Sequence, residues 1–296
     1  MLNLELRGPV LPFGQRDELK DLAMSKIEIR QIFYDQITRS QIQAPFIPLD
    51  NTLGDKSWFE FWAIYNFFSK NEDIQENCLY GFLSPKFSSK TGLSAISAIE
   101  EIESVIDKNE RDVVLFSYAW DQLCFFSNPW EQGEVVHPGI KKYTQNFINS
   151  TPLNIDLDQL FTSRQNSVFS NFVVAKKAFW ERWMDLANSF LIYADDTYSE
   201  LFQQLTPYRS GHEPIKAFIQ ERFPALILAT NSFSVGQIDV RTGFSAPFFV
   251  PTNENKNRLF ACDRIKDKII AQDPDPTLID EFYAARSQVY LNLPTE

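Results

Sequence analysis

Segments that favour β-strands and segments that favour helices alternate along the first half of this 296-residue chain. The runs KIEIRQIFYD (26–35), PFIPLD (45–50), CLYGFLS (78–84) and DVVLFS (112–117) are rich in Ile, Val, Phe and Leu, which predicts four strands. Before the last of these strands, Leu and Ile recur at spacings of three and four across residues 88–109, which predicts a helix. Strands that alternate with helices through short linkers are typical of parallel βαβ units, so we expect an α/β fold.

Further elements are predicted on both sides of the chain's midpoint. Residues 57–69 are crowded with aromatic rings, too dense for an alternating strand, and they predict a mostly buried helix. A strand is predicted at 169–175, an amphipathic helix at 178–194 and another helix at 214–228. Pro224 lies inside this last segment and should kink or end the helix.

These elements divide the chain into three parts. Residues 1–25 contain Pro and Gly without a sustained period, and we expect a peripheral segment. Residues 26–230 should form the α/β domain, in which helices flank the sheet. Residues 231–296 carry weaker patterns apart from a closing helix within 276–291, and we expect a helical, loop-rich extension packed on the same domain.

Charge and composition exclude several function classes. The formal net charge of -11 argues against nucleic-acid binding, which depends on Lys and Arg that neutralise phosphates. We find no signal-peptide pattern and no window of about 20 apolar residues, so we expect a cytoplasmic protein without membrane insertion. Three distant cysteines and two histidines provide little for a disulfide framework, a zinc site or histidine-based catalysis.

Polar side chains follow the ends of the predicted strands, where ligands bind in an open α/β sheet. They are Asp50 and Asn51, Ser84 and Lys86, and Asp121 and Gln122. If the strands are parallel, these side chains converge on one rim. Two alternatives remain: the Asp-Asn pair is also typical of a turn, and the lysine of a solvated helix entrance. No glycine-rich phosphate loop accompanies them.

Two further segments contain candidate residues. FFSNPWEQGEVVHPG (125–139) places Trp130, Glu131, Gln132 and His137 among Pro and Gly, which predicts an irregular loop of the kind that holds binding groups, or a turn-rich connector. Glu213 precedes the helix predicted at 214–228. It is either a cap stabilised by the helix dipole or a carboxylate held in a cleft as a general base.

Several of these segments together resemble a family of bacterial proteins found with polysaccharide-assembly enzymes and described as glycosyltransferases. The similar stretches are FIPLDNT, WFEFWAIYNF, YGFLSPKFSSKTGLS, DVVLFS, NPWEQGE, HPG and NFVVAKKAFWERW. Their order over residues 27–230 is more distantly similar to that in capsular polysaccharide glycosyltransferases.

The resemblance implies a nucleotide-diphosphosugar transferase of GT-A-like architecture, with a Rossmann-like, mostly parallel sheet joined to an acceptor-binding part. This sequence departs from metal-dependent members, because no D-x-D follows the strands at 78–84 and 112–117. We therefore expect no metal site, with a divalent metal as the alternative. Without a metal, Lys86 would offset the charge that develops on the leaving diphosphate.

Two functions are consistent with these observations. The first is transfer of a sugar from a nucleotide donor to a surface polysaccharide or lipid-linked glycan, by an enzyme peripheral to membrane-bound assembly enzymes. The second is an inactive, glycosyltransferase-like protein that binds glycans or serves as a scaffold. For the enzyme, the donor would bind Asp50, Asn51, Ser84, Lys86, Asp121 and Gln122, the acceptor or sugar would bind Trp130, Gln132 and His137, and Glu213 or Glu131 would be the catalytic base.

Overall fold

The computed structural model describes residues 26–196, 200–240, 243–272 and 275–292. The peripheral segment expected at 1–25 lies outside them. Within these ranges, no helix is both long enough and apolar enough to cross a membrane.

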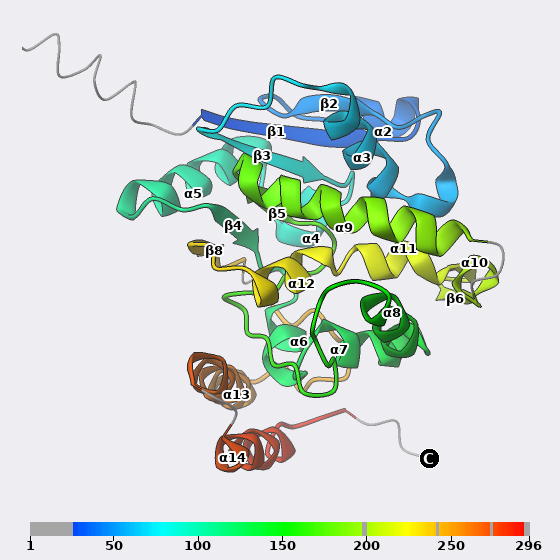
Figure 1. The fold of residues 1–296 in the computed structure, drawn as a ribbon. Helices are drawn as coiled ribbons and strands as arrows, with labels where there is room; N and C mark the ends of the chain where they lie inside the picture. Colours follow the sequence, from blue (N-terminus) through cyan, green and yellow to red (C-terminus); the bar gives the residue numbers. More distant parts are fainter. Residues whose placement is uncertain (1–25, 197–199, 241–242, 273–274, 293–296) are drawn as a thin grey trace, which may run out of the picture.

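Six strands form one mixed, mostly parallel sheet in the order β2-β1-β3-β5-β4-β8 (Figure 1). The strands are β1 (Lys26–Phe33), β2 (Ile47–Asp50), β3 (Cys78–Leu83), β4 (Val113–Phe116), β5 (Val173–Ala175) and β8 (Val235–Ile238). The pairs β1·β2, β1·β3 and β4·β8 are parallel, so the predicted α/β fold is confirmed. Strand β5 runs antiparallel to both of its neighbours, which the βαβ pattern did not predict.

Helices cover both faces of this sheet. The first part of the chain contains α2 (Gln36–Ser40), η1 (Lys56–Trp58), α3 (Glu60–Lys70), α4 (Phe87–Thr91), α5 (Ala95–Lys108), α6 (Trp120–Phe125), α7 (Pro129–Val136) and α8 (Ile140–Asn149). The second part contains α9 (Lys177–Asp195), α10 (Glu200–Gln203), α11 (Ile215–Gln220), α12 (Phe223–Thr230), α13 (Asn253–Ala271) and α14 (Pro276–Ser287), with a hairpin of β6 (Leu205–Tyr208) and β7 (Gly211–Pro214). Rings of α3 and α9 pack on Phe82 of the sheet, whereas α5 lies against Ile27 and Ile29 on the opposite face.

Two predicted helices are each split in two. The segment 88–109 changes from α4 to α5 at Gly92, whose φ of 74° ends the first helix, and Ser94 caps the second by accepting from the Ser97 N–H. The segment 214–228 breaks between α11 and α12, with Pro224 in the first turn of the second helix. The expected effect of this proline is therefore confirmed.

The prediction of an irregular loop at 125–139 is wrong, because residues 129–136 form α7 and Gly139 is the N-cap of α8. Oδ1 of Asn128 accepts the N–H groups of Trp130 and Glu131 (both 2.9 Å), and Pro129 occupies the first turn. Gly133 allows close packing, since a Cβ there would lie 2.7 Å from Ile140. Pro129 and Gly133, which indicated a loop, thus lie in the first turn of α7 and at its contact with α8.

The segment after residue 230 contributes to the sheet and also forms a second core. Strand β8 pairs with β4, so the sheet extends beyond the boundary that we expected at 230. Helices α13 and α14 pack together at the end of the molecule away from β1 and β2 (Figure 1). The buried ammonium of Lys266 donates to the carbonyls of Leu123 and Phe126, which ties α13 to α6.

A buried carboxylate fixes the loop that joins the two cores. Asp121 is fully buried, and its oxygens accept the N–H groups of Ser245 (2.6 Å) and Ala246 (2.9 Å) and the Ser245 hydroxyl. We expect Asp121→Ala to lower the free energy of unfolding by about 3 kcal/mol, because buried donors lose their acceptor. Urea unfolding checks this, with Asp280→Ala on the exposed face of α14 as control. Equal stability of the two variants would contradict the assigned role.

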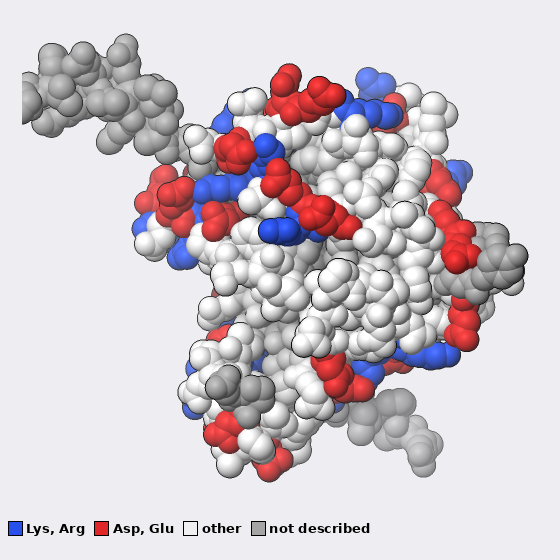
Figure 2. Space-filling view, in the orientation of Figure 1, with Lys and Arg blue, Asp and Glu red and all other residues white. Residues whose placement is uncertain are grey.

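Charged side chains of both signs are interspersed on the face seen in Figure 2. Among the described residues drawn there, Lys and Arg form no continuous basic area. The expectation of no nucleic-acid partner stays a prediction that agrees with this surface and with the net charge of -11.

Candidate active site

Charged and hydroxyl side chains gather where strands β1, β3 and β4 end. Tyr34 follows β1, Lys86 and Lys90 follow β3, and Tyr118 follows β4. The antiparallel strand β5 begins at the same edge, since the Phe116 N–H donates to the carbonyl of residue 172 (3.0 Å). The other five strands all have their carboxyl ends at this edge, which is where α/β sheets bind ligands.

An acid pair forms the centre of this cluster. Glu60 opens α3 and Glu221 directly follows α11, and the two carboxyls are close enough to repel each other. Burial raises the pKa of both, and the Glu60 charge helps to raise the pKa of Glu221 to about 7. The hydroxyl of Tyr34 contacts Glu60, and burial together with this carboxyl raises the pKa of the tyrosine. A pKa of about 7 allows Glu221 to gain or lose a proton near neutral pH.

Two lysines face the acid pair without forming an ion pair. Nζ of Lys90 donates to Ser170 Oγ (2.8 Å) and Tyr118 Oη (3.2 Å), and Nζ of Lys86 donates to Tyr208 Oη (3.3 Å). Burial alone would lower the pKa of Lys90, but Tyr118 and Glu221 raise it above its ordinary value. Among the described residues, the hydrogen-bond partners of both ammonium groups are hydroxyls.

Backbone strain is concentrated around the same cluster. Within the described ranges, the non-glycine residues with positive φ are Phe59 (48°), Ser170 (62°), Asn171 (49°) and Arg209 (53°). Phe59 directly precedes Glu60, and Ser170 accepts a hydrogen bond from Lys90. Asn171 follows Ser170, and Arg209 follows Tyr208. Such conformations cost about 1–3 kcal/mol each and persist where the surrounding structure fixes them, often at functional sites.

Asn51 supports this strained backbone. Its side chain is buried, and Nδ2 donates to the carbonyl of Phe59 (3.1 Å), directly before Glu60. Gly54 is needed beside it, because a Cβ there would lie 2.0 Å from Asn51 Oδ1. Asp50 is exposed and accepts the N–H of Thr52 (2.8 Å), as in a turn. Asn51 thus shapes the entry to α3. In this structure the side chains of both Asp50 and Asn51 bond the protein's own backbone.

A polar pocket of about 130 Å³ lies beside Glu221. Its lining includes Tyr118, Gln122, Gln132, His137, Ser170 and Arg222. Nη2 of Arg222 donates to Gln132 Oε1 (3.1 Å), Gln132 Nε2 to Gln122 Oε1 (2.9 Å), and Gln122 Nε2 to Ser245 Oγ (2.9 Å). Each glutamine has a second amide N–H, so the wall retains donors for a ligand.

His137 is a neutral member of this wall. It stacks on Phe218 with ring centroids 3.7 Å apart, and burial together with Arg222 lowers its pKa to about 4. In the unfolded chain the imidazole of His137 binds a proton below about pH 6.5, whereas in the folded protein it does so only below about pH 4. The free energy of unfolding therefore falls as the pH falls from about 6.5 toward 4.

We expect the stability difference between wild type and His137→Gln to shrink by about 3 kcal/mol from pH 8 to pH 4. Urea unfolding at several pH values measures this difference. His212→Gln changes an exposed histidine of β7 and is the matched control, for which a constant difference is expected. A pH-independent difference for His137→Gln would contradict a neutral, buried imidazole.

The other predicted site residues serve mostly structural roles. Ser84 is buried, with its carbonyl bonded to Gln31 and its hydroxyl to the N–H of Lys86. Trp130 is fully buried in the main core and presents no ring face to a ligand.

The two carboxylates expected to be the base lie outside the acid pair. Burial raises the pKa of Glu131, but Arg286 and the N–H of Ser127 outweigh it and leave the pKa below its ordinary value. Its Oε1 lies 2.6 Å from Arg286 Nη1 of α14. Glu213 is part of β7 and pairs with Thr206, so it does not cap a helix.

Sequence reasoning missed the central carboxylates. Glu60 lies inside the aromatic run predicted as a buried helix, and Glu221 lies within the segment predicted as a helix at 214–228; the sequence patterns indicated a functional role for neither. The only local signal is one acidic residue at position 60 among aromatic neighbours, which places a charge beside a core. Lys90 also had no assigned role.

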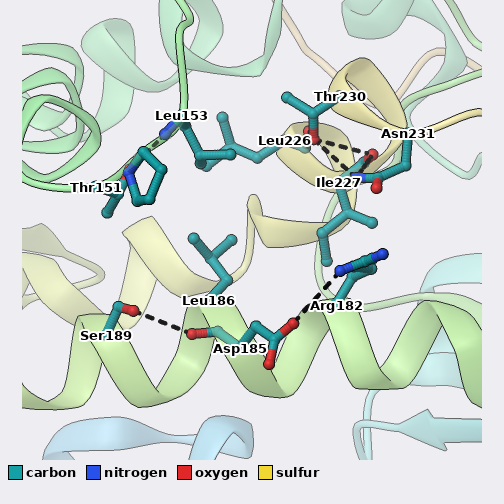
Figure 3. A pocket seen from close by; sticks show the side chains of 11 residues that line it. Thr151, Leu153, Arg182, Asp185, Leu186, Ser189, Leu226, Ile227, Thr230 and Asn231 are labelled. Carbon is teal, nitrogen blue, oxygen red and sulfur yellow. Dashed lines mark hydrogen bonds and ion pairs between the residues drawn. The ribbon is translucent and has the colours of Figure 1, made fainter.

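A larger hollow, of about 400 Å³, lies between α9, α12 and residues 151–153 (Figure 3). Its polar side chains bond within the protein: Arg182 pairs with Asp185 (3.7 Å), and Thr230 and Asn231 donate to the carbonyl of Ile227. Neither Glu60 nor Glu221, the carboxyls of the acid pair whose pKa is raised by burial, lines this hollow. We therefore place the candidate site at the sheet edge.

Over the described ranges, no three His, Cys, Asp or Glu side chains converge in a way that could hold a metal ion. The carboxyls of the acid pair face lysine ammonium groups instead.

Comparison with known proteins found no matching family model, no matching curated protein and no matching solved structure. The function is therefore argued from the geometry of the site.

Proposed function

We propose that this protein is a glycosyltransferase that moves a sugar from a nucleotide-diphosphosugar donor to a glycan acceptor. The observation that carries the proposal is a carboxyl of pKa about 7, Glu221, beside two lysines that have only neutral partners among the described residues. An inverting sugar transfer needs this combination: a base for the acceptor hydroxyl and positive charge for the departing diphosphate.

Lys86 and Lys90 are assigned to the diphosphate. Their ammonium groups follow β3 at the carboxyl edge of the sheet, and hydroxyls of Tyr208, Tyr118 and Ser170 orient them. A lysine binds phosphate as a point charge and retains N–H donors for it. These two cations would supply the charge stabilisation that a metal ion gives in metal-dependent transferases.

Glu221 is assigned as the general base, in place of Glu213 or Glu131. A base is most effective when its pKa is near the working pH, and Glu60 helps to provide this pKa. Glu221 also lines the polar pocket, whose glutamine amides and neutral His137 suit the hydroxyls of an acceptor sugar. The mostly parallel sheet agrees with the GT-A-like architecture that the sequence resemblance implies.

An inactive glycan-binding protein is the second candidate. The observation that favours it is the pocket volume of about 130 Å³, below the 300–1,000 Å³ common for small-molecule sites. A donor would have to lie over the open side of the cluster, near Lys86, which is exposed.

Thermal stabilisation by a panel of nucleotide sugars and nucleoside diphosphates, with and without Mg²⁺ or Mn²⁺, tests the proposal. A ligand that binds only the folded protein raises its Tm. We expect one nucleotide family to raise Tm and the corresponding sugar nucleotide to be consumed when a glycan acceptor is added. Binding of glycans with no response to any nucleotide would favour the inactive protein.

A further inference from the structure

Arg209 occupies the tip of the β6–β7 hairpin in a conformation that arginine rarely adopts. Its φ is 53°, in the left-handed region where Gly, Asn and Asp are the usual turn residues. An L-residue in this region costs about 1–2 kcal/mol. A long charged side chain is therefore held at a position where the backbone favours a small one.

The hairpin places this arginine beside the Tyr208 ring, which Lys86 also approaches. Its Cζ lies 5.1 Å from the centroid of the Tyr208 ring, and Nζ of Lys86 lies 5.9 Å from the same centroid. The ring itself packs against Phe218 (5.2 Å) and Phe59 (5.9 Å), so its position is fixed by the residues around the acid pair.

Lys86 and Arg209 thus lie near the same tyrosine ring, and Lys90 acts together with Lys86 on Glu221. Among the described residues, Lys86, Lys90 and Arg209 have no carboxylate oxygen within 4 Å, and the two lysines bond only hydroxyls. Arg209 is exposed and retains its planar set of N–H donors, which matches two phosphate oxygens at once.

We propose that Arg209 is a third phosphate-binding residue and that it makes the site selective for a diphosphate over a monophosphate. This inference rests on the proposed function and adds a specificity determinant that lies outside the sheet edge. Lys90, half-buried beside Ser170, would bind the inner end of the ligand, and Arg209 with Lys86 would bind the outer end.

Calorimetric titration with inorganic pyrophosphate and with inorganic phosphate tests this assignment on four proteins: wild type, Arg209→Asn, Arg209→Lys and Arg264→Asn. Asparagine tolerates positive φ, so Arg209→Asn removes the charge and keeps the turn. Arg264 is an exposed arginine of α13 and controls for the change in net charge. We expect Arg209→Asn to weaken pyrophosphate binding about tenfold and phosphate binding less than threefold, and Arg209→Lys to restore most of the affinity.

The outcomes separate this inference from the function on which it rests. If wild type and Arg209→Asn bind pyrophosphate equally, or if Arg264→Asn loses as much, Arg209 is not a phosphate ligand and the proposed function stands. If wild type binds neither pyrophosphate nor any nucleoside diphosphate, the proposed function fails as well.

Discussion

Glu221→Gln is expected to slow sugar transfer by a factor of at least about 100 at pH 8, because general base catalysis contributes about 10²–10⁴. Four charged groups act on Glu221, and burial is the largest single influence on its pKa. Glu60 raises this pKa further, whereas Lys90, Arg222 and Lys86 lower it, which leaves it at about 7. Wild-type activity should therefore rise with pH through about 7 and then level off. The glutamine variant should keep no such rise.

A stability readout distinguishes this effect from misfolding. The folded pKa of Glu221 is raised, so its ionisation destabilises the fold progressively as the pH rises from about 4.5 to about 7, and the loss of stability is constant at higher pH. Glu221→Gln should accordingly have a higher Tm than wild type at pH 8 and a similar Tm at pH 4. Glu213→Gln, in β7, is the matched control and should leave the rate and both Tm values unchanged.

Glu60→Gln gives the complementary result. Removing the carboxyl that repels Glu221 lowers the pKa of Glu221, so the rise of activity with pH should move to lower pH. If Glu221→Gln retains wild-type activity, or if its pH profile still rises through 7, Glu221 is not the base.

Lys90→Met is the second change with a large expected effect. The ammonium is half-buried and held by Ser170 and Tyr118, so its charge lies where solvent screens it little. Losing one preorganised charge opposite a developing negative charge typically lowers kcat about 10²–10³-fold. Methionine keeps most of the apolar length of the lysine side chain and loses only the ammonium, whose Nζ lies 5.4 Å from the centroid of the Phe172 ring.

Steady-state rates and diphosphate affinity are to be measured together for this variant. We expect kcat to fall more than the affinity for the donor, because the charge on the diphosphate grows in the transition state. Lys108→Met, an exposed lysine at the end of α5, is the control and should behave like wild type. An unchanged kcat for Lys90→Met would remove Lys90 from the transfer step.

Local patterns predicted most of the sheet and little of its topology. Strands β1, β3 and β4 are dense in β-branched and aromatic residues, a signal that depends only on neighbours in the sequence. The direction of β5 depends on where the chain returns after α6, α7 and α8, which no local pattern contains. Helix α7 was missed because Pro129 and Gly133 also fit a loop, and the deciding cap of Asn128 is a side-chain contact.

The candidate site shows the same division. The rule about strand ends pointed to the edge where we place the candidate site and included Lys86, but it could not tell which acidic residues lie beside this edge. Sequence alone gave no partners for Asp121 and Glu131, because these partners lie 124 and 155 residues further along the chain. Glu221 directly follows α11, which is far from the strand ends in sequence. Long-range burial determines the site, so sequence spacing alone did not reveal it.

A crystal structure with a bound nucleoside diphosphate is the first measurement to make, because it tests whether Lys86 and Lys90 bind the diphosphate. We predict both phosphates at the carboxyl edge of the sheet, within hydrogen-bonding distance of the Lys86 and Lys90 ammonium groups and beside Glu221. A nucleotide bound elsewhere, such as the hollow between α9 and α12, with the lysines still bonded only to their hydroxyls, would contradict it.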